Sequence, residues 1–234
     1  WSKPSCRWWL DGNIKMGEKT TYVNKKLKKN EEELFYFGKS EFNKIIKIKS
    51  SWLVKKKVLS NMLRLNILYM IQNAGSGHIG TSFSSIDLVN YIYFDFLNKE
   101  DIYFSSKGHD APALYSVLMA KNIIPFSDIH KFRRIKGLPG HPDVKTKGIY
   151  TNTGSLGMGI SKAKGFLLAN NFKKKKRKVI VLTGDGELQE GQFWESLMSI
   201  PKNISKNLII IVDNNKYQSD LTIQDTSSLG NLKN

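Results

Sequence analysis

Two short apolar segments, each ending in a polar turn, constrain this sequence more than any other feature. Residues 178–183 (KVIVLT) lead into a glycine-flanked turn with Asp185, and residues 208–213 (LIIIVD) lead into Asn215. A strand, a helix and a second strand with short connections predict a right-handed βαβ unit in a parallel sheet. Ligands bind at the carboxyl edge of such sheets. We therefore expect Asp185 and Asn215 to lie together at that edge.

The residue types at these two turns favour a metal ion that holds a diphosphate. A carboxylate oxygen of Asp185 and an amide oxygen of Asn215 are hard ligands that suit Mg²⁺. Gly184 and Gly186 allow the backbone to approach phosphate groups closely. The alternative for Asp185 is a capping aspartate before a helix.

Length, hydropathy and cysteine content limit the class of protein. The chain has 234 residues, enough for one large domain or two small ones. No apolar run approaches the roughly 20 residues of a membrane span, so we expect no membrane partner. No signal peptide is visible. The single cysteine, Cys6, excludes an internal disulfide framework and predicts a reducing, cytoplasmic location.

The net charge of +17 raises the question of a nucleic-acid partner. The basic residues are mostly lysines in short runs, such as 55–57 and 173–178, and such runs are usually solvated. We therefore expect no nucleic-acid partner. The remote alternative is a non-catalytic basic binding module, whose binding would weaken steeply with salt and survive loss of Asp185.

The chain divides into a basic N-terminal extension, residues 1–50, with no assigned function, and a domain at 51–234. Helical spacing predicts a helix over 53–71 that ends at Gly75, and Ser84 or Ser85 is expected to cap a helix that runs to Phe96. The other expected elements are a strand at 101–105 and helices at 111–121, 125–136, 156–170 and 190–198. The sequence stops soon after the second apolar strand, so we expect a sheet that is truncated or completed by another polypeptide.

Several separate motifs resemble the N-terminal, diphosphate-binding domain of transketolase, especially the form found as a separate subunit. The resemblance covers residues 51 to about 225, and its motifs are GSGHIG at 75–80, SKGHDAPALY at 106–115, LPGHP at 138–142, TGSLGMG at 153–159, and GDG with the later NNK at 214–216. A GDG turn with an asparagine thirty residues on is typical of thiamine diphosphate enzymes. The three histidine motifs narrow the resemblance to the transketolase group.

The resemblance implies a cofactor, thiamine diphosphate, held through Mg²⁺ or Ca²⁺. The implied metal ligands are Asp185, Asn215 and the backbone carbonyl of Tyr217. The implied cofactor-binding residues are Gly154, Ser155, Leu156, Gly184, Gly186, Glu187 and Asn215. Leu156 also fits a simple core position.

The resemblance implies catalytic roles for His78, His109, His141 and Glu190. Three of the four histidines fall in these glycine-bearing motifs, where an imidazole can donate to sugar hydroxyls or move protons. His130 matches no motif and is expected at the surface. Glu190 matches an acidic relay between the two active sites of a dimer, and helix capping is the alternative for it.

The implied reaction is transfer of a two-carbon ketol unit from a ketose phosphate to an aldose phosphate, as in the pentose phosphate pathway. The family's pyrimidine-binding domain is not in this sequence, so the implied partners are a C-terminal transketolase section and a homodimer or heterotetramer partner. Without them we expect weak cofactor binding and no turnover. Alternatives with the same cofactor are 1-deoxy-D-xylulose-5-phosphate synthase, which uses pyruvate, and a 2-oxo-acid dehydrogenase component, which lacks this histidine set.

Overall fold

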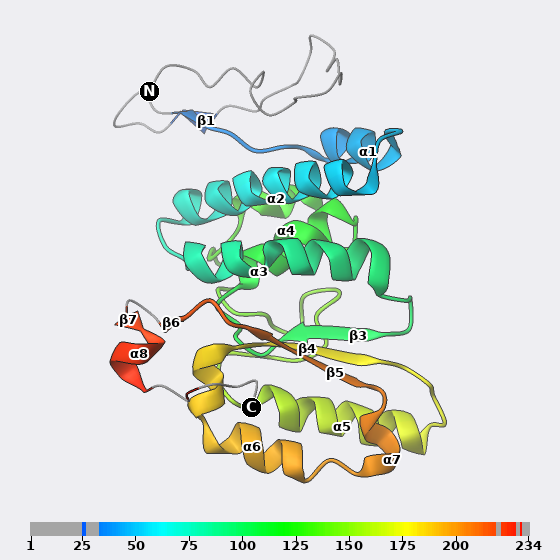
Figure 1. The fold of residues 1–234 in the computed structure, drawn as a ribbon. Helices are drawn as coiled ribbons and strands as arrows, with labels where there is room; N and C mark the ends of the chain where they lie inside the picture. The colour runs from blue at the N-terminus through cyan, green and yellow to red at the C-terminus, as the bar shows by residue number, and fades with distance from the viewer. Residues whose placement is uncertain (1–24, 27–32, 219–220, 228–229, 231–234) are drawn as a thin grey trace.

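A parallel sheet in the order β3-β4-β5 forms the centre of the molecule, between two layers of helices (Figure 1). The computed structural model describes residues 25–26, 33–218, 221–227 and 230. The strands are β3 (Ile102–Ser105), β4 (Val179–Gly184) and β5 (Leu208–Asp213). Both strand pairs are parallel, and Gly184 lies opposite Asp213. The predicted α/β fold, with helices flanking a parallel sheet, is confirmed.

Alternate residues of each strand enter separate cores on the two faces of the sheet. Ile180 and Leu182 of β4 pack with the first helical layer, whereas Val179 and Val181 pack with the second. Every residue of β4 is buried, because β4 has a strand on each side and helices on both faces. This is why the sequence of β4 is continuously apolar rather than alternating.

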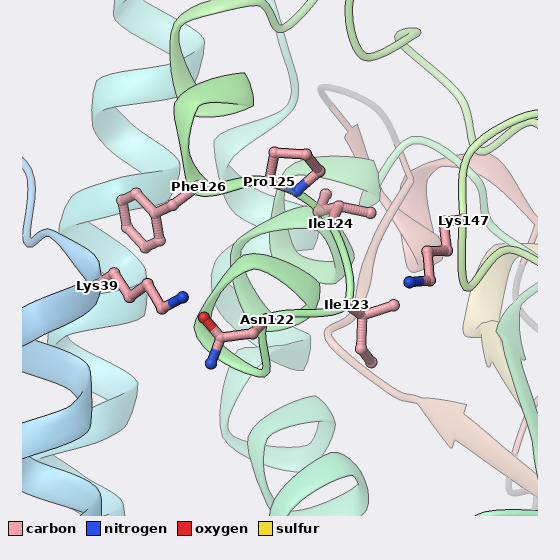
Figure 2. Close-up of a pocket in the computed structure, with 7 residues that line it drawn as sticks. All are labelled: Lys39, Asn122, Ile123, Ile124, Pro125, Phe126 and Lys147. Carbon is pink, nitrogen blue, oxygen red and sulfur yellow. The ribbon is translucent and has the colours of Figure 1, made fainter.

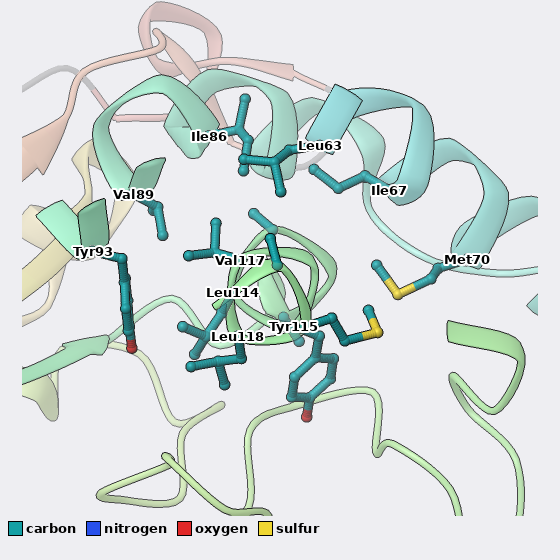
Figure 3. Close-up of a cluster of buried hydrophobic side chains, with 14 of the residues drawn as sticks. Leu63, Ile67, Met70, Ile86, Val89, Tyr93, Leu114, Tyr115, Val117 and Leu118 are labelled. Atoms are coloured by element: carbon teal, nitrogen blue, oxygen red, sulfur yellow. The ribbon is translucent and has the colours of Figure 1, made fainter. Parts of the chain in front are cut away.

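The first helical layer contains α2 (Trp52–Ala74), α3 (Ile79–Tyr91) and α4 (Ala111–Ala120). The Ser51 hydroxyl accepts a hydrogen bond from the Val54 amide at 3.4 Å and caps α2, which ends at Gly75 with φ 74°. Figure 3 shows apolar side chains of α2, α3 and α4 converging on one buried cluster. Ala111 begins α4 directly after the histidine-bearing loop, so this packing fixes the loop at the sheet edge.

The second layer contains α5 (Gly159–Phe172), α6 (Gly191–Met198) and the short α7 (Lys202–Ser205). The segment predicted as a helix from residue 156 begins its helix at Gly159, because residues 154–158 form a loop. The predicted helix at 125–136 is only a 3₁₀ turn, η3 (Phe126–His130). A π-helix, η2 (Ile92–Phe96), follows α3, and a 3₁₀ turn, η4 (Asp185–Gln189), follows β4. The remaining elements are β6 (Tyr217–Gln218), β7 (Leu221–Thr222) and α8 (Ile223–Thr226).

The predicted cap of α3 at Ser84 or Ser85 is wrong. The helix begins at Ile79, and His78 occupies the N-cap position. Ser85 donates back to the carbonyl of Thr81 at 2.9 Å, and Ser84 donates to Asp213 at 2.6 Å. These hydroxyls are therefore satisfied inside the helix and across the sheet edge rather than at a helix start.

Part of the predicted N-terminal extension joins the core. Helix α1 (Lys39–Lys47) was not predicted, and its Phe42 and Ile45 are buried in the same cluster as α2. Residues 25–26 and 33–34 form a short antiparallel pair, β1 (Lys25–Lys26) with β2 (Glu33–Leu34). Residues 1–24 and 27–32, including Cys6, lie outside the described residues. Within the described part of the chain, no helix has the length and apolarity needed to cross a membrane.

Candidate functional site

The carboxyl ends of β4 and β5 bring the two predicted polar turns together. The Lys216 amide donates to Asp185 Oδ2 at 2.7 Å, which ties the turn after β4 to the turn after β5. The Gly186 amide donates to Asp185 Oδ1 at 3.0 Å, and the Tyr217 amide donates to Asn215 Oδ1 at 2.9 Å. The expected juxtaposition of Asp185 with the Asn215 loop is therefore present.

Asp185 has the surroundings of a cation ligand. Its side chain is only 6% exposed, and none of the ion pairs among the described residues gives it a Lys or Arg partner. The other ligands that the sequence singled out are the Asn215 amide oxygen and the Tyr217 backbone carbonyl, which are hard oxygens of the kind Mg²⁺ and Ca²⁺ prefer. No cluster of three or more His, Cys, Asp or Glu side chains that could hold a metal occurs in the described ranges, so a site here would depend on this mixed oxygen set.

Glu187 joins three segments of the site through its carboxylate. Oε1 accepts from the Ser106 hydroxyl at 2.5 Å and the Gly157 amide at 3.0 Å, while Oε2 accepts from the Gly184 amide at 2.9 Å. Burial raises the pKa of Glu187, and these hydrogen bonds oppose the rise. Both oxygens are engaged within the chain, so Glu187 shapes the turn after β4 and the 154–159 loop.

Three histidines gather beside this edge. The rings of His78 and His109 are 5.3 Å apart between centroids. His141 lies against two glycines, since a Cβ built on Gly108 or Gly154 would be 3.0 or 3.2 Å from its Cδ2. Gly108 and Gly154 have φ of 71° and 126°, so these positions favour glycine for both conformation and space.

His130 lies away from this cluster. Its Nδ1 is 2.8 Å from the hydroxyl of Tyr69, and its ring packs edge-on against Tyr36. The residue is exposed overall, as expected, but it also closes the contact between η3 and α2.

His109 and His141 favour the neutral form. Burial lowers the pKa of His109, although the Asp110 carboxylate and the Lys107 carbonyl oppose the shift. Burial also lowers the pKa of His141, with further lowering from the nearby charges of His109, Arg133 and His78. His109 Nδ1 lies 2.8 Å from the Lys107 carbonyl, which can only accept, so the proton sits on Nδ1 and Nε2 keeps a lone pair.

We predict that His109 and His141 titrate below the ordinary histidine pKa of about 6.5. Because their folded pKa values are depressed, protonation favours the unfolded chain, so stability falls as pH drops from about 6.5 through the folded values. Ring-carbon NMR shifts, assigned with His109→Gln and His141→Gln, measure both pKa values. A pKa at or above 6.5 for both rings would contradict the described packing.

Several polar atoms in the segments that adjoin the histidines are buried without a partner. Within the described residues these include Thr81 Oγ1, Ser82 Oγ, Asp110 Oδ1 and Thr153 Oγ1. Thr81 and Ser82 lie in the first turn of α3, Asp110 precedes α4, and Thr153 lies against Gly108. Buried polar groups in native proteins are normally satisfied. Their grouping here fits a site that receives a polar ligand.

Lys107 is a site residue to which the sequence assigned no role. Its side chain is 2% exposed, and Nζ donates to Asp213 Oδ2 at 2.7 Å and to the Thr81 carbonyl at 3.4 Å. Its Cδ would lie 3.2 Å from a Cβ on Gly184. The lysine therefore runs beneath the turn after β4 and ties the ends of β3 and β5 together.

The remaining predicted residues lie around the 154–159 loop. Ser155 and Leu156 are exposed, with Leu156 at 37%, so the core position considered for Leu156 is not what the structure shows. Glu190 is exposed at the N-cap position of α6 and makes no side-chain capping hydrogen bond there. A Cβ on Gly157 would lie 2.6 Å from Glu190 Cβ, which places this loop directly against Glu190.

Gly157→Ala is expected to destabilise the chain by at least about 2 kcal/mol. Gly157 has φ 74°, which costs an L-residue about 1–2 kcal/mol, and the new methyl group would also collide with Glu190. Urea unfolding measures the change. The matched control is Gly165→Ala in the middle of α5, where a Cβ meets nothing within 4 Å and should stabilise by about 0.5–1 kcal/mol. Equal midpoints for wild type and Gly157→Ala would contradict the packing.

A cavity in the described part of the chain lies away from this candidate site. Figure 2 shows a hollow of about 330 Å³ between α1 and the segment that follows α4, with Lys39, Asn122 and Lys147 among its lining residues. Helix α4 separates it from His109 by its own length, about 15 Å. The candidate site rests on the sheet edge and not on this cavity.

Comparison with known proteins agrees with the geometry. Residues 55–229 match the family model described as "Transketolase, thiamine diphosphate binding domain". The chain belongs to the transketolase family. The match covers most of the domain that was predicted at 51–234, and it contains all the predicted site residues.

Two curated relatives show what share of a transketolase's length this chain covers. It is 38% identical over 176 residues to a protein of Actinobacillus succinogenes that is named as one subunit of apulose-4-phosphate transketolase, covering 70% of this chain and 63% of the relative. It is 32% identical over 176 residues to human transketolase, covering 70% of this chain and 28% of the relative. The chain thus spans less than two thirds of these relatives' lengths.

A solved structure shares the fold of this transketolase domain. The transketolase from Leishmania mexicana superposes with a TM-score of 0.67 at 26% identity, over 74% of this chain and 29% of that one. The histidine and GDG motifs of the sequence and the three-layer fold therefore lead to the same family.

Proposed function

We propose that this chain provides the metal- and diphosphate-binding half of a transketolase-like active site. The observation that carries the proposal is the meeting of the Asp185 turn, the Asn215 loop and the three-histidine cluster at one sheet edge. The proposed activity is transfer of a two-carbon ketol unit from a ketose phosphate to an aldose phosphate.

The proposed metal ligands are Asp185, Asn215 and the backbone carbonyl of Tyr217, with Mg²⁺ or Ca²⁺ as the ion. The support is that Asp185 is buried and that two backbone amides fix the orientation of its carboxylate. The glycine-rich turns leave room for phosphate groups near the backbone. Residues proposed to line the cofactor are Gly154, Ser155, Leu156, Gly184, Gly186 and Glu187.

Thiamine diphosphate, when bound, supplies the carbanion and electron-sink chemistry of the reaction. The chain's histidines serve the sugar. His109 Nε2 has a free lone pair, because Nδ1 donates to the Lys107 carbonyl, so it can accept a hydroxyl proton. His78 and His141 are beside it and can donate to or accept from neighbouring hydroxyls. Glu190, which is exposed at the start of α6, is the residue proposed to take part in an acidic relay to a second protomer.

The proposed partner is a C-terminal transketolase section with a pyrimidine-binding domain, assembled as a homodimer or heterotetramer. The support is that two relatives, from Actinobacillus succinogenes and Clostridium sp., are named as transketolase subunits. Their names describe sugars with an anionic group, a phosphate in one and a sulfonate in the other. Sugars of this class are the proposed substrates.

The test is to mix the purified chain with a purified C-terminal partner and assay ketol transfer between sugar phosphates. We expect transfer only from the mixture and only with thiamine diphosphate and a divalent cation. Turnover by this chain alone would contradict the half-site proposal. Condensation of pyruvate with an aldose phosphate, in place of ketol transfer, would instead identify a deoxyxylulose-phosphate synthase activity.

A further inference from the structure

Arg133 bridges two of the loops that carry the histidines. Its Nη1 donates to the Ser76 hydroxyl at 3.0 Å, two residues before His78. Its Nε would be 2.9 Å from a Cβ built on Gly140, the residue before His141. The guanidinium therefore lies over the backbone of one histidine loop while bonding the other.

The loop that carries Arg133 is held in a costly conformation. Arg133 has φ 54° and Lys136 has φ 58°, a region that non-glycine residues seldom occupy. The Arg133 amide donates to the Leu138 carbonyl at 2.7 Å, which closes the loop and fixes this geometry. Backbone strain of this kind is frequent at functional sites. It also occurs after helices α4 and α5, at Asn122 and Lys174, so here it supports the proposal only together with the contacts of Arg133.

The charge of Arg133 is free to act on a ligand. Its side chain is exposed, and none of the ion pairs among the described residues includes it. The positive charge of Arg133 also acts on His141, because it contributes to lowering the pKa of that histidine. An arginine with spare donors suits a phosphate, which it can hold with two parallel hydrogen bonds.

We propose that Arg133 binds the anionic group of the sugar substrate, with the Ser76 hydroxyl beside it, and so contributes to selection of phosphorylated sugars. The inference rests on the proposed function and adds a residue of this chain to substrate recognition. In this proposal Arg133 is a specificity residue for the anionic group, and the three histidines contact the hydroxyl-bearing part of the sugar.

The kinetic test uses the chain reconstituted with its C-terminal partner. Arg133→Leu is expected to lower kcat/KM for a ketose phosphate about 10- to 100-fold, which is the range of a charge-assisted hydrogen bond. The kcat/KM for the same ketose without its phosphate should stay within about twofold of the wild-type value. Arg133→Lys keeps the charge but not the paired donors, so it should fall between wild type and Arg133→Leu.

The matched control is Arg134→Leu, an identical charge change one residue on. Arg134 donates to the Asn73 carbonyl at 2.6 Å, so both substrates should react as with wild type. Equal losses on phosphorylated and unphosphorylated ketoses in Arg133→Leu would overturn the proposal, because the arginine would then only support the loop. No loss on either substrate would overturn it as well.

A second measurement separates this inference from the proposed function. Inorganic phosphate is titrated into the chain alone while NMR follows the ring of His141. A saturable shift in wild type that disappears in Arg133→Leu supports the anion site even if reconstituted wild type transfers no ketol unit. If the wild-type chain shows no shift, or if Arg133→Leu shows the same shift as wild type, the proposed anion site is wrong.

Discussion

Asp185→Asn is expected to weaken metal-dependent binding of thiamine diphosphate by more than about 100-fold. Substitutions of residues that only hydrogen-bond to metal ligands typically lower metal affinity or activity 10–100-fold. This change removes the negative charge of a proposed metal ligand itself. Asparagine keeps the shape and one acceptor oxygen. The Gly186 and Lys216 amides that donate to Asp185 would then face an amide group in place of two carboxylate oxygens. Calorimetric titration with and without Mg²⁺ measures the loss.

Asp128→Asn is the control for this change. Asp128 pairs with Lys131 at 2.8 Å on the surface of η3, away from the sheet edge. The same loss of charge there should leave cofactor binding unchanged. If Asp185→Asn binds thiamine diphosphate with wild-type metal dependence, Asp185 is a capping aspartate and not a metal ligand.

Lys107→Met is expected to destabilise the chain by about 3–5 kcal/mol, the usual result of removing one partner of a buried ion pair. Lys107 is 2% exposed and its partner Asp213 is 11% exposed. The substitution would leave the Asp213 carboxylate with only the Ser84 hydroxyl as a side-chain donor. Since domains unfold at about 5–15 kcal/mol, the variant would lose a large part of its stability.

Urea unfolding of Lys107→Met and of the double variant with Asp213→Asn separates the causes. The double variant should lose less stability than the sum of the two single changes, because the Asp213 charge is removed together with its partner. Asp110, 3.9 Å from Lys107 Nζ, keeps its charge in both lysine variants, so its contribution is the same in each. Lys131→Met breaks the exposed pair with Asp128 and should cost less than about 1 kcal/mol. Additive losses in the double variant would show that Lys107 and Asp213 do not interact as described.

The elements at the sheet edge were predictable because their signals are local. The apolar runs of β4 and β5 and the turns that follow them indicated the parallel pair and the meeting of Asp185 with the Asn215 loop. The histidine motifs predicted loops that bring an imidazole close to a ligand, because each histidine lies beside a glycine. The structure adds the reason, which is that His141 packs against Gly108 and Gly154.

The wrong or missing predictions come from contacts between distant segments. Ser84 reads as a helix cap, yet its hydroxyl bonds Asp213, 129 residues away. The sequence assigned Lys107 no role beyond its motif, and only the fold reveals its burial beneath Gly184. Helix α1 is different, because its nine residues are clearly amphipathic, with Phe42 and Ile45 buried among lysines, and the lysine-rich segment around it was left unassigned. Long-range burial decides the cases of Ser84 and Lys107, and local patterns do not encode it.

The proposed half-site needs a metal ion to bind the cofactor and a partner chain to catalyse ketol transfer. The most direct measurement is calorimetric titration of thiamine diphosphate into the wild-type chain, with and without Mg²⁺, and with and without the C-terminal partner. We expect weak, metal-dependent binding by the chain alone and tighter binding with the partner. Metal-independent binding, or no binding even with the partner and Mg²⁺, would contradict the account.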